Sequence, residues 1–172
     1  MIVCNSSILI ALSLVHKLGL LKKKCKGEKL IIPKAAWKEV VEEGEGRPGA
    51  TEIANADWIK VEEVQNQDIV KILLTQIDHG EAEAITLALE KKANLILLDE
   101  KEAREIAQRL GLKVIGTIGL FVWAKREGFI GTVKEYLDAL QNDAGFRLKP
   151  ELYKQVLIEV DELKNNDKNH KT

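Results

Sequence analysis

Residues 78–100 read DHGEAEAITLALEKKANLILLDE, and this stretch combines an amphipathic helix with a short buried strand. Apolar residues recur at helical spacing through its first half, so residues 80–92 are predicted to form a helix. The apolar run LILL, residues 95–98, follows a short polar turn and ends at Asp99 and Glu100. A helix followed by a buried strand that ends in acids is typical of α/β proteins, which place site residues beyond the carboxyl ends of parallel strands.

The same alternation of strand and helix extends over the first two thirds of the chain. Further short apolar runs predict strands at residues 2–4, 30–32, 58–61 and 113–115. Amphipathic patterns predict helices at residues 8–21, 34–43, 68–77 and 101–110, and after Gly116 only helices, at residues 118–127, 132–144 and 150–163. This pattern predicts a three-layer α/β/α fold with a mainly parallel sheet of four or five strands and a helical C-terminal third. We expect one domain over residues 1–163 and a polar, disordered tail at residues 164–172.

The composition restricts the class of protein. A chain of 172 residues is long enough for one domain with a sizeable core. No apolar run approaches the roughly 20 residues that a membrane helix needs, and the sequence goes straight into a strand without a signal-peptide pattern, so we expect no membrane partner. The two cysteines match no disulfide or zinc pattern, which is typical of reduced thiols in a cytoplasmic protein. The net charge of −1 indicates that any contact with nucleic acid is local.

Polar residues follow the predicted strands at the points where these strands end. Asn5, Ser6 and Ser7 follow the first strand, and Asp99 follows the fourth. Glu81 lies one turn before the buried stripe of its helix, so its side chain should point along the sheet rather than into water. These side chains should therefore converge at one edge, where clustered carboxylates repel each other unless a divalent cation holds them together.

Each of these residues also has a purely structural interpretation. Asp78 and Glu81 have the spacing of a helix capping box. Asp99 and Glu102 share that spacing, and Asn5 can cap the helix that follows it. Only the joint placement of the residues at one sheet edge favours a functional site over a set of caps.

Four segments of the chain together resemble a PIN domain. They are CNSSILIAL, IPKAAWKEV, DHGEAEAITLALEKKANLILLDE and LKVIGTIGLFVWAKREGFI, and the similarity extends from about residue 2 to about residue 157. The block with GEAEAI and LLDE is the more specific part, and it is similar to a VapC-like prokaryotic subgroup described as predicted nucleic-acid-binding proteins. The resemblance implies a PIN-like fold and a metal-dependent ribonuclease, and many PIN domains are toxins of VapBC toxin–antitoxin pairs.

The resemblance also implies a quartet of catalytic and metal-binding residues. The four acidic positions of the family fall on Asn5, Glu39, Glu81 and Asp99. Such a site would use Mg²⁺ or Mn²⁺ to hydrolyse RNA, because the ion neutralises phosphate charge and activates water. Asn5 is neutral and removes one of the four charges, and Leu98 stands where a hydroxyl residue commonly precedes the fourth acid. These departures leave the expected fold unchanged but predict weakened activity.

Two functions therefore stay open. The chain is either a metal-dependent endoribonuclease weakened by its neutral first position, or a PIN domain that binds RNA or a protein partner without cutting. The expected RNA-contacting residues are Ser6, Ser7, Lys101 and Arg104, although basic segments are as a rule solvated faces. An antitoxin would be the protein partner of a toxin. The apolar segment GLFVW, residues 119–123, predicts a homodimer, with ordinary core as the alternative.

Overall fold

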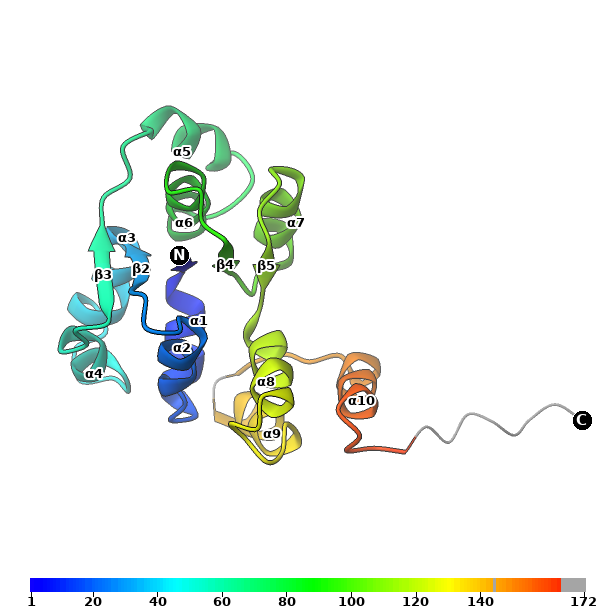
Figure 1. The fold of residues 1–172 in the computed structure, drawn as a ribbon. Coiled ribbons are helices and arrows are strands. Elements are labelled where there is room, and N and C mark those ends of the chain that lie inside the picture. Colours follow the sequence, from blue (N-terminus) through cyan, green and yellow to red (C-terminus); the bar gives the residue numbers. More distant parts are fainter. Residues whose placement is uncertain (144, 165–172) are drawn as a thin grey trace, which may run out of the picture. The chain divides into compact units, whose positions relative to one another are not determined.

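A computed structural model describes residues 1–143 and 145–164, and residues 2–115 contain a parallel sheet (Figure 1). The strands lie in the order β3–β2–β1–β4–β5, and every neighbouring pair is parallel. The first strand is central, because Ile2 lies opposite Leu30 on one side and opposite Leu95 on the other. The five strands are β1 (Ile2–Cys4), β2 (Leu30–Pro33), β3 (Ile59–Glu62), β4 (Leu95–Leu97) and β5 (Val114–Ile115). The predicted parallel sheet is confirmed, with five strands.

Contacts divide the chain into two compact units, Met1–Thr117 and a second that begins at Ile118. The sheet and the helices that flank it belong to the first unit. These helices are α1 (Ser6–Leu14), α2 (Gly19–Lys24), α3 (Lys34–Trp37), the π-helical turn η1 (Lys38–Glu42), α4 (Ala50–Ala54), α5 (Gln67–Leu73), α6 (His79–Glu90) and α7 (Lys101–Arg109). A sheet covered by helices in this way agrees with the predicted α/β/α class.

The local differences from the predicted helices lie mainly in the first third of the chain. The predicted helix at residues 8–21 is wrong, because the chain leaves the helix after Leu14 and starts a new one at Gly19. His16 lies between them with a φ angle of 54°, which no α-helix accommodates. The helix predicted at residues 34–43 forms but widens into η1, and α4 was not predicted.

Helix α6 supplies much of the core of the first unit. Its residues Ala84, Ile85 and Ala88 are fully buried and belong to one apolar cluster with strand residues Val3 and Ile96. Small alanine side chains let this helix approach the sheet closely. Helix α6 leads into β4, so it runs antiparallel to the strands and begins at the edge of the sheet where the strands have their carboxyl ends. Its first turn is therefore positioned at the edge where polar residues were predicted.

The second unit contains only helices among its described residues. They are α8 (Thr117–Arg126), which starts at the last residue of the first unit, α9 (Lys134–Asp143) and α10 (Pro150–Glu159). The ring of Phe121 stacks on Tyr136 with centroids 5.2 Å apart, and Glu162 accepts hydrogen bonds from the backbone N–H groups of Val133 and Lys134. The predicted helical C-terminal third is thus confirmed.

The predicted homodimer, single domain and disordered tail remain untested by the structure. Phe121 and Val122 are buried within the chain, which agrees with the core interpretation of the segment GLFVW, and the homodimer remains a prediction. One domain over residues 1–163 also remains a prediction, and residue 144 and most of the predicted tail, residues 165–172, lie outside the described residues. Over the described part of the chain, every helix is too short or too polar to span a membrane.

Candidate functional site

Asn5 lies directly after β1 and is almost completely buried, with 3% of its surface exposed. Its side-chain oxygen accepts a hydrogen bond from the Ser7 hydroxyl at 2.9 Å and a longer one from the backbone N–H of Ile8 at 3.5 Å. Asn5 is therefore the N-cap of α1, as one of the sequence-based interpretations proposed. Ser6 is buried in the first turn of the same helix, so only Ser7 of the two serines is partly exposed.

Glu81 lies in the first turn of α6 and forms a capping box with Asp78. The Asp78 carboxylate accepts a hydrogen bond from the backbone N–H of Glu81 at 2.8 Å, and the Glu81 oxygen Oε2 accepts one from the backbone N–H of Asp78 at 3.3 Å. The other oxygen, Oε1, is buried and receives no hydrogen bond from any described residue. Burial, together with the negative charges of Asp78, Glu100 and Glu102, raises the pKa of Glu81 to about 7. The capping box thus satisfies only half of this carboxylate.

Asp99 lies at the carboxyl end of β4 and is held by Thr117 from the neighbouring strand end. Its Oδ1 accepts the backbone N–H of Thr117 at 2.8 Å, and its Oδ2 accepts the Thr117 hydroxyl at 2.6 Å. Burial raises the pKa of Asp99, while the two hydrogen bonds from Thr117 and the charge of Arg104 oppose this rise. Asp99 and Glu102 therefore do not form the capping box that their spacing allows, and the cap position of α7 is taken by Glu100.

Gly116 makes the approach of Asp99 to Thr117 possible. A Cβ atom at this position would lie 2.9 Å from Asp99 Oδ1 and 3.1 Å from Arg104 Nη1. Any side chain larger than hydrogen would therefore push against a carboxylate and a guanidinium group at the same point. The same distances show that Arg104, one of the predicted RNA contacts, reaches the sheet edge from α7.

Glu39 and Lys101 lie on the exposed margin of this edge. Glu39 belongs to η1, and its Oε2 lies 4.0 Å from the position that a Cβ on Gly80 would take, which places it beside the first turn of α6. Lys101 opens α7 and forms an ion pair with Glu105 at 3.8 Å. Both side chains face solvent, so they can move toward a bound ligand.

An open pocket of about 500 Å³ adjoins the first turn of α6. It is lined by Leu74, Gln76, Ile77, Asp78, Glu81, Glu100 and Glu102. No three His, Cys, Asp or Glu side chains of the described residues are grouped closely enough to hold a metal ion, and this applies to Glu39, Glu81 and Asp99 as well as to the four carboxylates of the pocket lining. The edge is therefore acidic but open in this conformation.

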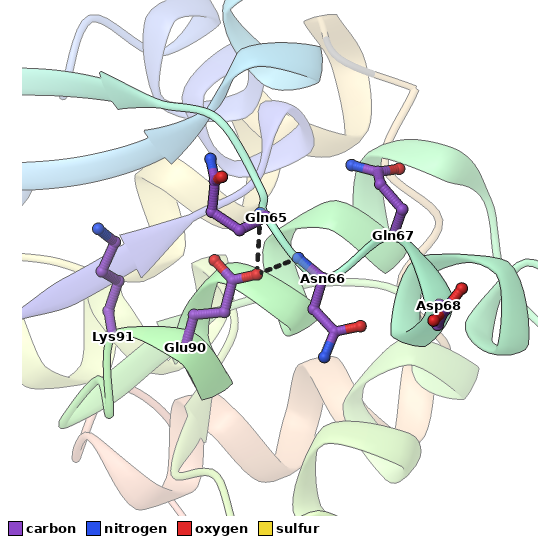
Figure 2. A pocket seen from close by; sticks show the side chains of 6 residues that line it. All are labelled: Gln65, Asn66, Gln67, Asp68, Glu90 and Lys91. Carbon is purple, nitrogen blue, oxygen red and sulfur yellow. Dashed lines mark hydrogen bonds between the residues drawn. The ribbon is translucent and has the colours of Figure 1, made fainter.

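A second pocket, of about 660 Å³, has a different character (Figure 2). It lies between the loop after β3 and the last turn of α6, and Glu90 Oε1 accepts the backbone N–H groups of Gln65 and Asn66 there. The side-chain amide groups of Gln65 and Gln67 donate to carbonyl oxygens of the same loop. These bonds explain the loop conformation and leave no unpaired buried group that would point to a ligand.

Comparison with protein families identifies the chain. A family model described as a PIN domain matches residues 1–162. The chain belongs to the PIN-domain family. No curated protein matches it. PIN domains have a nuclease-type fold and in general depend on divalent metal ions. The acidic edge of this PIN domain is therefore the region in which to look for its chemistry.

The sequence analysis did not predict that Thr117 lies at the carboxyl edge of the sheet beside Asp99. The signal was present, because Thr117 follows the fifth strand just as Asn5 follows the first and Asp99 the fourth. Glu100 was predicted at the end of the fourth strand together with Asp99, and it lines the same pocket as Glu81. Glu102 was considered only as a possible capping-box partner of Asp99.

Proposed function

We propose that this PIN domain is a divalent-metal-dependent ribonuclease that hydrolyses phosphodiester bonds of RNA with Mg²⁺ or Mn²⁺. The observation that carries the proposal is the buried oxygen Oε1 of Glu81, which no described group of the chain satisfies. The Glu81 carboxylate lies near those of Asp78, Glu100 and Glu102, and Asp99 directly precedes Glu100 after β4. Unpaired buried acids are costly, and a cation at this edge would offset that cost.

The donor atoms of the edge fit a hard cation to different degrees. Each Asp99 oxygen accepts one hydrogen bond from Thr117 and keeps a further lone pair, and Glu81 keeps both lone pairs of Oε1. The Asn5 oxygen already accepts two hydrogen bonds, so it is the weakest ligand of the proposed set of Asn5, Glu39, Glu81 and Asp99. A divalent ion bound there would supply charge neutralisation at a phosphate and a water of lowered pKa.

The chain's own residues would orient the RNA and the acids. Thr117 holds the Asp99 carboxylate in one orientation through two hydrogen bonds. Lys101, Arg104 and the serines Ser6 and Ser7 are proposed to contact the RNA backbone beside the edge. Because the protein carries a net charge of −1, these contacts must act locally rather than through a broad basic surface.

The alternative is a PIN domain that binds RNA or a protein partner without cutting it. The cap geometry of Asn5 favours this function, because an amide that is committed to α1 contributes neither charge nor a free lone pair to an ion. A toxin role with an antitoxin partner, a homodimer and a cytoplasmic location belong to the proposal for the nuclease. Light scattering at high micromolar concentration tests the dimer, and a small antitoxin-like reading frame beside the gene would support the toxin.

Cleavage of end-labelled RNA separates the two functions. The nuclease should cut in Mn²⁺ or Mg²⁺, stop cutting in the presence of a chelator, and lose activity in Asp99→Asn purified in the same way. The Asp99→Asn preparation also controls for contaminating nucleases. Uncut RNA that is bound equally well with and without metal would reject the nuclease and establish the binding function.

A further inference from the structure

The guanidinium group of Arg104 is half-buried but is not bonded to any other group. Among the described residues, it takes part in no hydrogen bond and no ion pair, although α7 carries it to the edge of the sheet. The half-buried Lys91 and Lys125 differ, because each of them forms an ion pair with a glutamate. A charged group that is partly withdrawn from water without a bonded partner loses hydration and gains nothing in return. The donors of Arg104 are therefore available to a ligand.

The carboxylate of Asp99 lies near this guanidinium group, yet the two groups are not bonded. A Cβ atom on Gly116 would lie 2.9 Å from Asp99 Oδ1 and 3.1 Å from Arg104 Nη1, so both groups approach the same point. Burial raises the pKa of Asp99, and the charge of Arg104 is one of the effects that oppose this rise. Both Asp99 oxygens accept hydrogen bonds from Thr117 instead of from Arg104. Thr117 thus holds the carboxylate beside the guanidinium group and leaves the guanidinium donors unused.

We propose that Arg104 anchors one phosphate group of RNA beside Asp99, and that the charge of Asp99 weakens this contact. A guanidinium group presents paired N–H donors that match two oxygens of one phosphate. The negative charge of Asp99 attracts the guanidinium group and repels an approaching phosphate, so it opposes binding in two ways. Removal of this single charge should therefore strengthen the binding of RNA, and it should do so only when Arg104 is present.

This inference deepens the proposed function, because it takes RNA as the ligand and gives Asp99 a second effect on it. It does not require cleavage, since the phosphate is held by a side chain of the protein. Binding is therefore measured in the presence of EDTA, which keeps the RNA intact. A protein that binds RNA as described below but does not cut it in Mn²⁺ would refute the nuclease and leave the Arg104 anchor in place.

The first experiment measures the affinity of the full chain for a fluorescein-labelled oligouridylate by fluorescence anisotropy at several salt concentrations. Arg104→Ala should weaken binding at least about fivefold, because a charge-assisted contact is lost. The slope of log affinity against log salt concentration should fall by about 0.7, the contribution of one phosphate contact to a single strand. The matched control is Arg109→Ala, since Arg109 lies on the same helix but is exposed and paired with Glu105 at 3.9 Å. This control should change the affinity by less than about twofold.

The second experiment tests the opposing effect of Asp99 with the same RNA. Asp99→Asn should bind it about three to ten times more tightly than the parent, because a repelling charge is removed close to the phosphate. Adding Asp99→Asn to Arg104→Ala should give less than about a twofold gain, since no phosphate is then anchored nearby. Glu52→Gln is the charge control, because this exposed acid lies on α4, and it should leave the affinity within about twofold of the parent.

Several results would overturn the anchor. They are no binding of the RNA by the parent, equal losses in Arg104→Ala and Arg109→Ala, and an affinity of Asp99→Asn no higher than that of the parent. A gain from Asp99→Asn that persists without Arg104 would have the same meaning. Displacement of the RNA by polyglutamate at equal charge concentration would show that the site accepts any polyanion, including an acidic protein segment, and would reject phosphate recognition. Circular dichroism verifies that every variant is folded.

Discussion

Replacing Thr117 with valine tests whether the neighbouring strand end holds Asp99 in place. Thr117 is fully buried, and valine has nearly the same shape but no hydroxyl. The variant keeps the backbone N–H bond to Asp99 Oδ1 and loses the 2.6 Å hydroxyl bond to Oδ2. A hydrogen bond to a charged group contributes about 1.5–3 kcal/mol, so the free energy of unfolding at pH 7 should fall by that amount.

The pH dependence of this loss provides the more specific test. The hydroxyl bond favours the ionised carboxylate, so the pKa of Asp99 in the folded state should be higher in Thr117→Val than in the parent. The difference in stability should therefore be complete only at a pH above the titration of Asp99 in both proteins. It should shrink as the pH falls through the titration of Asp99 and vanish once the carboxyl is protonated in both.

Urea denaturation followed by circular dichroism between pH 4 and pH 7.5 measures both effects. Thr117→Ser is the control, because it keeps the hydroxyl and loses only a buried methyl, which costs about 1 kcal/mol at every pH. A Thr117→Val protein as stable as the parent would refute the reasoning. So would a Thr117→Ser protein whose loss of stability depends on pH in the same way as that of the valine variant.

Four further substitutions test other parts of the chain. Asn5→Asp should lower the stability of the metal-free protein but increase its stabilisation by Mn²⁺ by about 1–2 kcal/mol after desolvation. In the same thermal melts, Asp99→Asn should be more stable than the parent without metal and should gain less from Mn²⁺. Equal melting shifts on adding Mn²⁺ to the parent and to both variants would exclude an ion at this edge. Gly116→Ala should cost about 1–3 kcal/mol in urea denaturation, because the new Cβ would lie 2.9 Å from Asp99 Oδ1. Burial would raise the pKa of Glu162, but its hydrogen bonds from Lys125, from two backbone N–H groups and from a threonine lower it to about 2. Because this value lies below the ordinary 4.5, ionised Glu162 should stabilise the fold above pH 4.5 by about 1–2 kcal/mol after solvent screening and should lose that effect toward pH 2. The free energies of unfolding of Glu162→Gln and of the parent should therefore differ at neutral pH and become equal in acid.

The sheet could be predicted from sequence because its strands are short apolar runs that end abruptly in polar residues. β1 and β4 both show this pattern, and their parallel pairing follows from the helices between them. The break between α1 and α2 could not be predicted, because apolar residues at helical spacing continue across it from Leu12 to Leu18. It depends on the positive φ angle of His16, a backbone property that hydrophobic periodicity does not report.

The site shows a similar limit of sequence reasoning. Two pairs of acids share the spacing of a capping box, but only Asp78 and Glu81 form one. Asp99 instead accepts both donors of Thr117, which is distant in sequence and adjacent only because β5 lies beside β4. Spacing along the chain therefore predicts which caps are geometrically possible. The choice between a cap and a tertiary hydrogen bond depends on which donors the folded sheet brings near.

The role of Asn5 follows from the same competition between local and tertiary partners. Aspartate and asparagine cap helices about equally well, so capping α1 does not require the neutral residue. The end of β1 already lies near an acid, because burial and the charge of Asp99 both raise the pKa of the Cys4 thiol, one residue before Asn5, so a negative charge there already has an electrostatic cost. One more carboxylate would raise that electrostatic cost unless a cation were bound. Asn5 thus keeps the cap while it limits repulsion, and the proposed cation would depend more on the acids of α6 and of the end of β4 than on the end of β1.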